Sequence, residues 1–142
     1  MKSKSVSVNI ARSLLLAAAL PFMAGPALGA SQCAWPAWEN YKQQMISADG
    51  RVIDASSPQQ VTTSEGQSYG LFFALVANDP QSFERLLNWT RDNLASGAFD
   101  RHLPAWQWGL NKDGQWRVLD SNNASDADLW IAYSLLEAGR LW

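Results

Sequence analysis

Hydrophobic and polar positions along the chain alternate between two kinds of helical segment. Residues 35–45 and 80–95 are amphipathic, with apolar side chains on one face and charged or amide side chains on the other. Residues 65–77 and 125–142 are apolar on nearly every face, which is the pattern of a helix covered on all sides. The order along the chain is half-exposed, buried, half-exposed, buried. Two concentric layers of helices give this order, whereas a simple antiparallel bundle gives four similar stripes.

The ends of these segments carry start and stop signals. Pro36 suits the first turn of the first helix, and Asp79 is placed to cap the third. Residues 51–54 predict a short extended piece. Between the third and fourth helices, residues 106–119 predict a hairpin or a long loop around the turn at Asp113.

The two buried segments have too few partner helices within this sequence to cover them. The last segment also runs to Trp142 without a cap or a stop signal. A two-layer helical barrel needs about a dozen helices and roughly 300 residues or more. We therefore expect an all-α fold of which this sequence is the N-terminal piece.

The first 29 residues are expected to be a secretory signal peptide. Three basic residues open the segment, and the apolar run at 13–23 is too short to span a bilayer. Small residues then precede Ala30 at the two positions that a signal peptidase reads. We expect a periplasmic or secreted protein without a membrane anchor, whose folded part is residues 30–142.

Composition narrows the functional classes. The 142 residues include 11 Lys+Arg and 13 Asp+Glu, a formal net charge of -2 that becomes -5 without the signal peptide. This acidic balance argues against a nucleic-acid or anionic-membrane partner. Cys33 and His102 are each the only residue of their type, so we expect no internal disulfide, no multi-histidine or cysteine metal centre and no cofactor. The unusual count is eight Trp, all between residues 30 and 142.

Acidic residues stand at the start of both buried segments. Glu65 opens one, and Asp126 and Asp128 open the other, so parallel inner helices would bring these carboxylates to one end of a barrel. Acids in a first turn are often only caps that contribute about 0.3–1 kcal/mol each. Thr62 with Glu65, and Ser125 with Asp128, have the spacing of a capping box, and the pattern alone favours this explanation.

Two neighbouring features favour a ligand site at these helix starts. Gly66 and Gly70 cost helix stability, which makes sense where a bulky ligand or a backbone must come close. A cluster of polar residues that includes Asn122 precedes Asp126.

The tryptophans between these acids suggest a groove for a polysaccharide. Flat indole rings stack on the apolar CH faces of sugars, and Trp106 and Trp108 lie close together in a loop that contains a proline, with Trp116 further along. Core packing is an equally open explanation for Trp106 and Trp108. It is the explanation that we favour for three others: Trp38, Trp89 and Trp142.

Hydrolysis of a glycosidic bond needs two carboxyl groups. One is a protonated acid beside the leaving oxygen, and Glu65, near Tyr69 and Phe72, is a candidate. The other is a base for water or a nucleophile. Asp126 is the candidate within this chain, and the base could equally lie outside it.

Two segments resemble one known family. Residues 124–142 (ASDADLWIAYSLLEAGRLW) resemble the signature of family 8 glycoside hydrolases, and residues 63–70 (TSEGQSYG) resemble the segment that carries that family's catalytic acid. Residues 33–142 look like the N-terminal third of the periplasmic endoglucanases encoded with bacterial cellulose synthases. The resemblance implies an (α/α)6 barrel, of which this chain would supply roughly the first third.

The resemblance also implies roles for single residues. Glu65 matches the general acid of an inverting endo-β-1,4-glucanase. Asp126 matches the family's substrate-binding aspartate. The resemblance therefore implies that Asp126 is not the base, since the family's base is an Asp downstream of this chain. Asp128 is assigned to the helix start. The expected substrate-binding residues are Tyr69, Trp106, Trp108 and Asn122.

The implied partner is cellulose as a polysaccharide substrate, with a functional link to the cellulose synthase machinery. Two alternatives stay open: a non-catalytic exported module that binds glucan, and the same fold acting on chitosan, xylan or mixed-linkage glucan. Because the base lies outside it, this chain alone is expected to be inactive.

Overall fold

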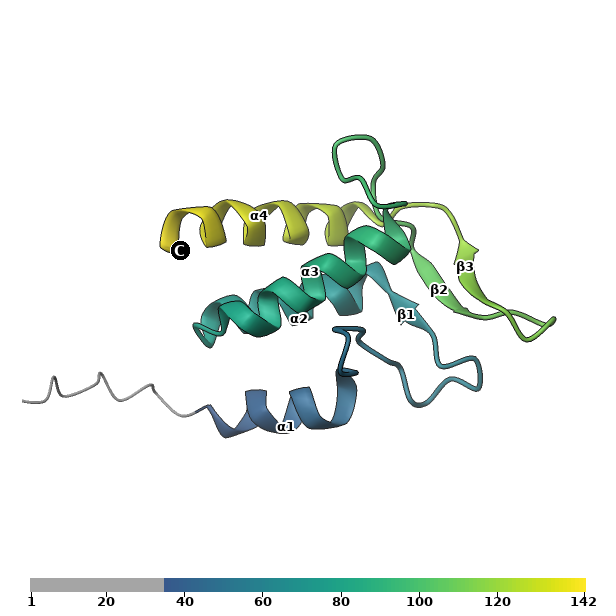
Figure 1. The fold of residues 1–142 in the computed structure, drawn as a ribbon, viewed down its shortest axis with the longest axis horizontal. Helices are drawn as coiled ribbons and strands as arrows, with labels where there is room; N and C mark the ends of the chain where they lie inside the picture. Colours follow the sequence, from purple (N-terminus) through teal and green to yellow (C-terminus); the bar gives the residue numbers. More distant parts are fainter. Residues whose placement is uncertain (1–34) are drawn as a thin grey trace, which may run out of the picture. The chain divides into compact units, whose positions relative to one another are not determined.

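The computed structural model describes residues 35–142, so the signal peptide expected at 1–29 lies outside the described residues. The described part contains four helices and three short strands (Figure 1). In chain order they are α1 (Pro36–Met45), β1 (Thr62–Thr63), α2 (Ser64–Val76), α3 (Pro80–Leu94), β2 (Gln107–Leu110), β3 (Trp116–Asp120) and α4 (Ser125–Leu141). The predicted helices and the predicted hairpin are confirmed, and each helix agrees with its predicted range to within one residue at either end.

α2 is largely buried, as the sequence predicts, whereas α4, predicted to be covered on all sides, leaves apolar side chains exposed within the described residues. α2 and α4 lie side by side and run in the same direction, and α3 returns in the opposite direction along α2 (Figure 1). α2 is central because it packs against both α3 and α4. The core joins all four helices and the segment before β1, through Trp38, Val52, Leu71, Ala74, Leu75, Phe83, Leu86, Ile131 and Ala138. The exposed side chains of α4 include Leu129 and Leu136, whereas α3 exposes polar residues such as Glu84.

The glycines of α2 make room for core side chains. A Cβ added at Gly70 would lie 3.1 Å from the Leu86 side chain and 3.2 Å from that of Val52. A Cβ at Gly66 would lie 3.5 Å from Val52. The expectation that a bulky ligand or a backbone approaches these glycines is therefore wrong, since the close neighbours belong mainly to the packed interior.

A small antiparallel sheet, in the order β1-β2-β3, leads into α2. Thr62 pairs with Trp108 and Thr63 with Gln107, so the residues just before α2 are held against β2. β1 was not predicted, because its pairing depends on a strand far along the chain.

This pairing shifts the cap of α2 by one residue. The N-cap is Thr63, whose hydroxyl accepts a hydrogen bond from the Gly66 N–H at 3.1 Å. The capping box predicted for Thr62 and Glu65 is therefore wrong. Thr62 belongs to the strand and is buried, where its hydroxyl donates to the Val52 carbonyl at 2.6 Å.

The capping box predicted for α4 is also wrong. The N-cap is Ala124, and no side chain caps this helix start. One carboxylate oxygen of Asp128 accepts a hydrogen bond from the Asn123 side chain at 2.6 Å instead of from a helix N–H, and the other is buried without a partner.

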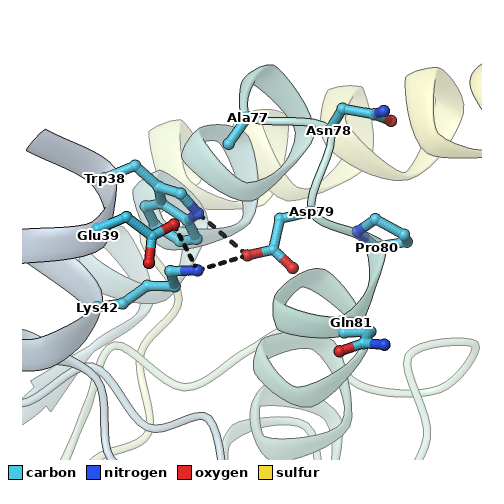
Figure 2. A pocket seen from close by; sticks show the side chains of 8 residues that line it. All are labelled: Trp38, Glu39, Lys42, Ala77, Asn78, Asp79, Pro80 and Gln81. Carbon is cyan, nitrogen blue, oxygen red and sulfur yellow. Dashed lines mark hydrogen bonds and ion pairs between the residues drawn. The ribbon is translucent and has the colours of Figure 1, made fainter. Parts of the chain in front are cut away.

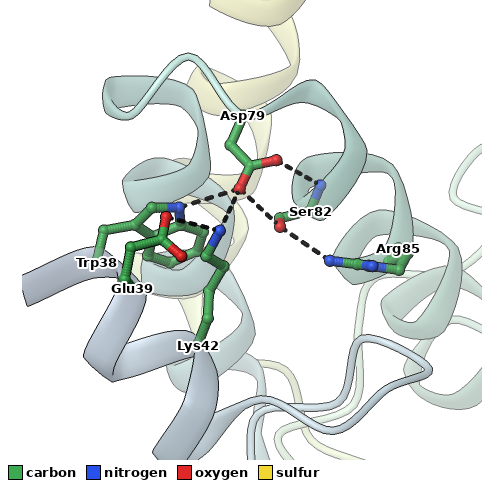
Figure 3. A network of polar contacts seen from close by, with 6 residues as sticks. All are labelled: Trp38, Glu39, Lys42, Asp79, Ser82 and Arg85. Atoms are coloured by element: carbon green, nitrogen blue, oxygen red, sulfur yellow. Dashed lines mark hydrogen bonds and ion pairs between the residues drawn. The ribbon is translucent and has the colours of Figure 1, made fainter. Parts of the chain in front are cut away.

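Asp79, the predicted cap of α3, fastens α1 to the turn between α2 and α3 (Figure 3). Its carboxylate accepts hydrogen bonds from the Ser82 N–H at 3.0 Å and the Ser82 hydroxyl at 2.8 Å, which confirms the cap. It also accepts from Trp38 Nε1 at 3.1 Å and from Lys42 Nζ at 2.9 Å, both on α1. One carboxylate therefore joins three elements.

Candidate active site

The structure brings the starts of α2 and α4 together through Trp106. The Ser64 N–H donates to the Trp106 carbonyl at 2.9 Å, and the Trp106 N–H donates to the Asn122 carbonyl at 2.6 Å. One residue of the chain thus bonds to the first residue of α2 and to the segment just before α4. Because both helices start beside this segment, the acids of both helix starts lie at the same end of the fold, as the sequence predicts (Figure 1).

The Trp106 side chain also contacts the candidate acid. Its indole Nε1 donates a hydrogen bond to Glu65 Oε1 at 3.0 Å. An indole N–H can only donate, so Oε1 is held as an acceptor. Glu65 Oε2 has a single long contact, with the Ser64 hydroxyl at 3.3 Å.

Aromatic side chains of α2 and α4 follow Glu65 along the two helices. Tyr69, one turn further along α2, is exposed. Phe72 lies 4.9 Å from the ring of Trp130 and 6.3 Å from that of Tyr133, measured between ring centroids. These last three rings line an open apolar pocket of about 320 Å³. α2 and α4 therefore present an aromatic surface further along the helices from Glu65.

The remaining predicted binding residues lie at the start of α4. Asp126 is exposed in the first turn of the helix. Asn122 is exposed, and its backbone N–H donates to the Asp120 carboxylate at 2.9 Å. Both side chains are accessible to a ligand at the same end of the fold as Glu65.

The tryptophans divide between core and surface. Trp38 and Trp89 are buried, which confirms core packing for both. Trp142 is 45% exposed, so the prediction of core packing is wrong for this residue. Its ring forms a T-shaped pair with Phe83 at a centroid distance of 5.3 Å, and its indole N–H donates to the Asn78 side chain at 2.9 Å. Trp106 is 37% exposed.

Trp108 is half-buried within a cluster of other side chains. Trp89 packs edge-on against its ring at a centroid distance of 5.3 Å, and Trp116 stacks on it at 5.2 Å. The Arg51 guanidinium lies 4.5 Å from its ring centroid. Arg51 could not be predicted from the sequence, because no local pattern indicates that a cation in one loop contacts the rings of a distant hairpin.

A polar pocket of about 410 Å³ lies beside α1 and the turn between α2 and α3 (Figure 2). Its lining includes Glu39, Lys42, Asn78 and Asp79. Asp79 is occupied by its hydrogen bonds, and the neighbouring Trp38 ring is 2% exposed. Because a sugar needs an accessible ring face, this pocket does not fit the polysaccharide site that the sequence predicts.

Residues 35–142 show neither a metal-binding cluster nor a membrane-spanning helix. Within this range no group of three or more His, Cys, Asp or Glu residues is arranged to hold a metal ion. No helix in the same range is long and apolar enough to cross a membrane.

The candidate acid Glu65, held by the Trp106 indole, therefore lies beside the starts of both α2 and α4. The family model "Glycosyl hydrolases family 8" matches residues 13–142, and the chain belongs to this family.

Curated relatives and solved structures agree with this membership. The endoglucanase of Escherichia coli O157:H7 is 60% identical over 110 residues, which are 78% of this chain and 30% of that protein. The endoglucanase of Xanthomonas axonopodis pv. citri (strain 306) is 59% identical over 113 residues, or 79% of this chain and 29% of that protein. The crystal structure of endo-1,4-D-glucanase from Vibrio fischeri ES114 aligns with a TM-score of 0.75 at 60% identity, over 77% of this chain and 31% of that chain.

The chain therefore spans about 30% of the length of the curated relatives it matches. Its structural neighbours in family 8 are (α/α)6 barrels, which confirms the predicted fold class and the predicted share of about a third. The small sheet is an addition to the helical pattern.

Proposed function

We propose that this chain contributes the acid half of an inverting endo-β-1,4-glucanase that acts on cellulose. The observation that carries the proposal is the Glu65 carboxyl group, held by the Trp106 indole at the common start of α2 and α4. The 60% identity to a protein described as an endoglucanase supports the same activity.

In this mechanism Glu65 donates a proton to the glycosidic oxygen as the bond from that oxygen to the anomeric carbon breaks. A water molecule attacks the anomeric carbon from the opposite face, and its proton passes to a second carboxylate. That base is an aspartate outside this chain. Asp126 and Asn122 bind sugar hydroxyl groups, while Tyr69 and Trp106 contact sugar rings.

The test joins residues 30–142 of this chain to the part of the E. coli O157:H7 endoglucanase that follows its matched segment. We expect this chimera to hydrolyse carboxymethyl cellulose and to release the inverted anomer, as seen by NMR. Glu65→Gln should lower the rate by about 10²–10⁴-fold, because the group can no longer donate a proton. Glu84→Gln, an exposed change on α3, serves as the matched control and should leave the rate unchanged.

Circular dichroism should show the same helix content for both variants. A Glu65→Gln chimera that folds and keeps its rate would show that Glu65 is not the acid. Activity on chitosan, xylan or mixed-linkage glucan in place of cellulose would keep the acid and change the substrate.

We also propose that the protein is exported to the periplasm or secreted, after cleavage before Ala30, and that it works beside the cellulose synthase machinery. The basic start and apolar run at 1–29 support export. Sequencing the N-terminus of the protein from its native source tests the cleavage, and a product that begins at Met1 would contradict it.

A further inference from the structure

The hairpin of β2 and β3 carries an indole ring that the site described above does not use. Trp116, the first residue of β3, lies opposite Leu110 of β2 and is 46% exposed. Its ring stacks on that of Trp108 with an angle of 16° between the planes. One side of the ring is therefore occupied, and the orientation of the ring is fixed.

The Arg51 guanidinium supports the ring from the same side as Trp108. It lies 4.7 Å from the Trp116 centroid and 4.5 Å from the Trp108 centroid, and the two centroids are 5.2 Å apart. These three separations form a nearly equilateral triangle. A group on the far side of Trp116 would lie much further from Trp108, so the outer face of Trp116 is left open by both neighbours.

The support itself is anchored in the fold. Arg51 is 8% exposed, and its Nε donates to the Thr62 hydroxyl at 2.8 Å, while its Nη2 donates to the Gln60 carbonyl. The guanidinium also lies against the faces of both rings, which attract its positive charge. Trp108 is braced in turn by the buried Trp89.

The ring also lies at the end of the β2–β3 pair that is further from Trp106, because Trp116 is opposite the last residue of β2. Trp106 immediately precedes β2, and Leu110, which lies opposite Trp116, is four positions further along the chain. At about 3.3 Å per residue, this places Trp116 about 13 Å along the sheet from Trp106. That separation corresponds to a few sugar units of an extended glucan chain.

We propose that the outer face of Trp116 is a stacking platform for a sugar unit of a β-1,4-glucan chain, with Trp108 and Arg51 as its support. This proposal rests on the proposed function for the class of ligand. It also replaces the substrate-binding role predicted for Trp108 from the sequence: Trp108 supports the ring of Trp116, and Trp116 contacts the sugar.

The first test follows the indole N–H resonances of the ¹⁵N-labelled chain by NMR during titration with cellohexaose. The Trp116→Phe and Trp106→Phe variants assign the two resonances. We expect the Trp116 resonance to move with cellohexaose concentration, while that of the buried Trp38 stays in place. A Trp116 resonance that does not move would overturn the platform.

The second test measures the affinity of the chimera, carrying Glu65→Gln, for cellohexaose by calorimetry. Trp116→Leu keeps apolar volume but removes the ring, and it should weaken binding about tenfold, whereas Trp116→Tyr should keep most of the affinity. Trp142→Ala is the matched control, because Trp142 is 45% exposed, and should have no effect. Equal affinities for Trp116→Leu and the unaltered chimera would mean that other parts of the domain cover this ring.

The two proposals can fail separately. If the Trp106 resonance moves and the Trp116 resonance does not, the platform is wrong and the acid assignment stands. If the Trp116 resonance moves but the Glu65→Gln chimera remains active, the platform stands and the acid assignment is wrong.

Discussion

Asp79 shows how one side chain can join several elements. Partial burial by itself raises the pKa of this carboxyl group, but hydrogen bonds from Lys42, Ser82 and Trp38 outweigh burial and hold the pKa well below its usual range. The charged form is therefore the form that the folded protein stabilises.

This shift predicts a pH-dependent effect of Asp79→Asn. Because the folded-state pKa is depressed, the stabilisation is fully present above the unfolded-state pKa of about 3.9 and is lost as the pH falls through the folded-state value. We expect the variant to lose about 1–3 kcal/mol in free energy of unfolding at pH 7, and the difference from the original chain to shrink below pH of about 4. Urea denaturation at a series of pH values measures the loss of stability at pH 7 and its decrease at lower pH.

The exposed Asp100 provides the control for this experiment. Its side chain is 76% exposed, so Asp100→Asn should change stability little at any pH in the series. A difference between Asp79→Asn and the original chain that stays constant from pH 7 down to pH 2 would contradict the role given to the charge.

At the scale of elements, a buried amide holds α2 to its neighbours. Gln67 Oε1 accepts from the Val52 N–H at 2.6 Å, and Nε2 donates to the Thr90 hydroxyl at 2.8 Å and to the Gly50 carbonyl at 3.2 Å. The side chain is fully buried. It links α2, α3 and the extended segment before β1 without any contact to solvent.

Gln67→Leu should therefore be costly although leucine has a similar size. It leaves the Val52 N–H buried without a partner, and we expect a loss of at least about 2 kcal/mol in free energy of unfolding. Gln44→Leu is the matched control, since that exposed amide bonds only to Asn40 one turn away, and it should change stability by less than about 0.5 kcal/mol. Equal urea midpoints for the two variants would refute the linking role.

The elements also show which features could be predicted from the sequence. The helix ranges follow from side chains within each helix, so the apolar pattern is sufficient for them. The cap at Thr63 could not be predicted, because the pairing of β1 with β2 decides where the extended chain ends. The same strand register determines the hydrogen bond between Trp106 and Glu65. It also determines that Trp108 is half-buried while Trp116 is exposed, so neither feature could be predicted from local patterns.

At the scale of the whole molecule, α4 presents uncovered apolar side chains. Leu129 and Leu136 are 72% and 75% exposed, and Trp130 and Tyr133 of the same helix are also exposed. A contiguous apolar surface of this kind on the described residues favours association.

We predict that the chain binds the dye ANS and self-associates at micromolar concentration. The double variant Leu129→Gln/Leu136→Gln should weaken association at least about tenfold, because each buried leucine contributes about 1.5–3 kcal/mol. Sedimentation velocity measures the change. Leu103→Gln alters a leucine of the loop before β2 that is 62% exposed and should have a smaller effect; a change as large as that of the double variant would show that α4 is not the contact.

The bonds from Trp106 to Ser64 and Asn122 have a consequence for changes in chain length. Residues 111–115, at the far end of the hairpin, touch neither helix start, so extra residues could be added at that tip while the spacing between the two acidic helix starts is kept. A single deletion between Trp106 and Trp108 would slip the register and turn each following side chain to the other face of the sheet. The two halves of one short hairpin therefore differ sharply in how freely their length can vary.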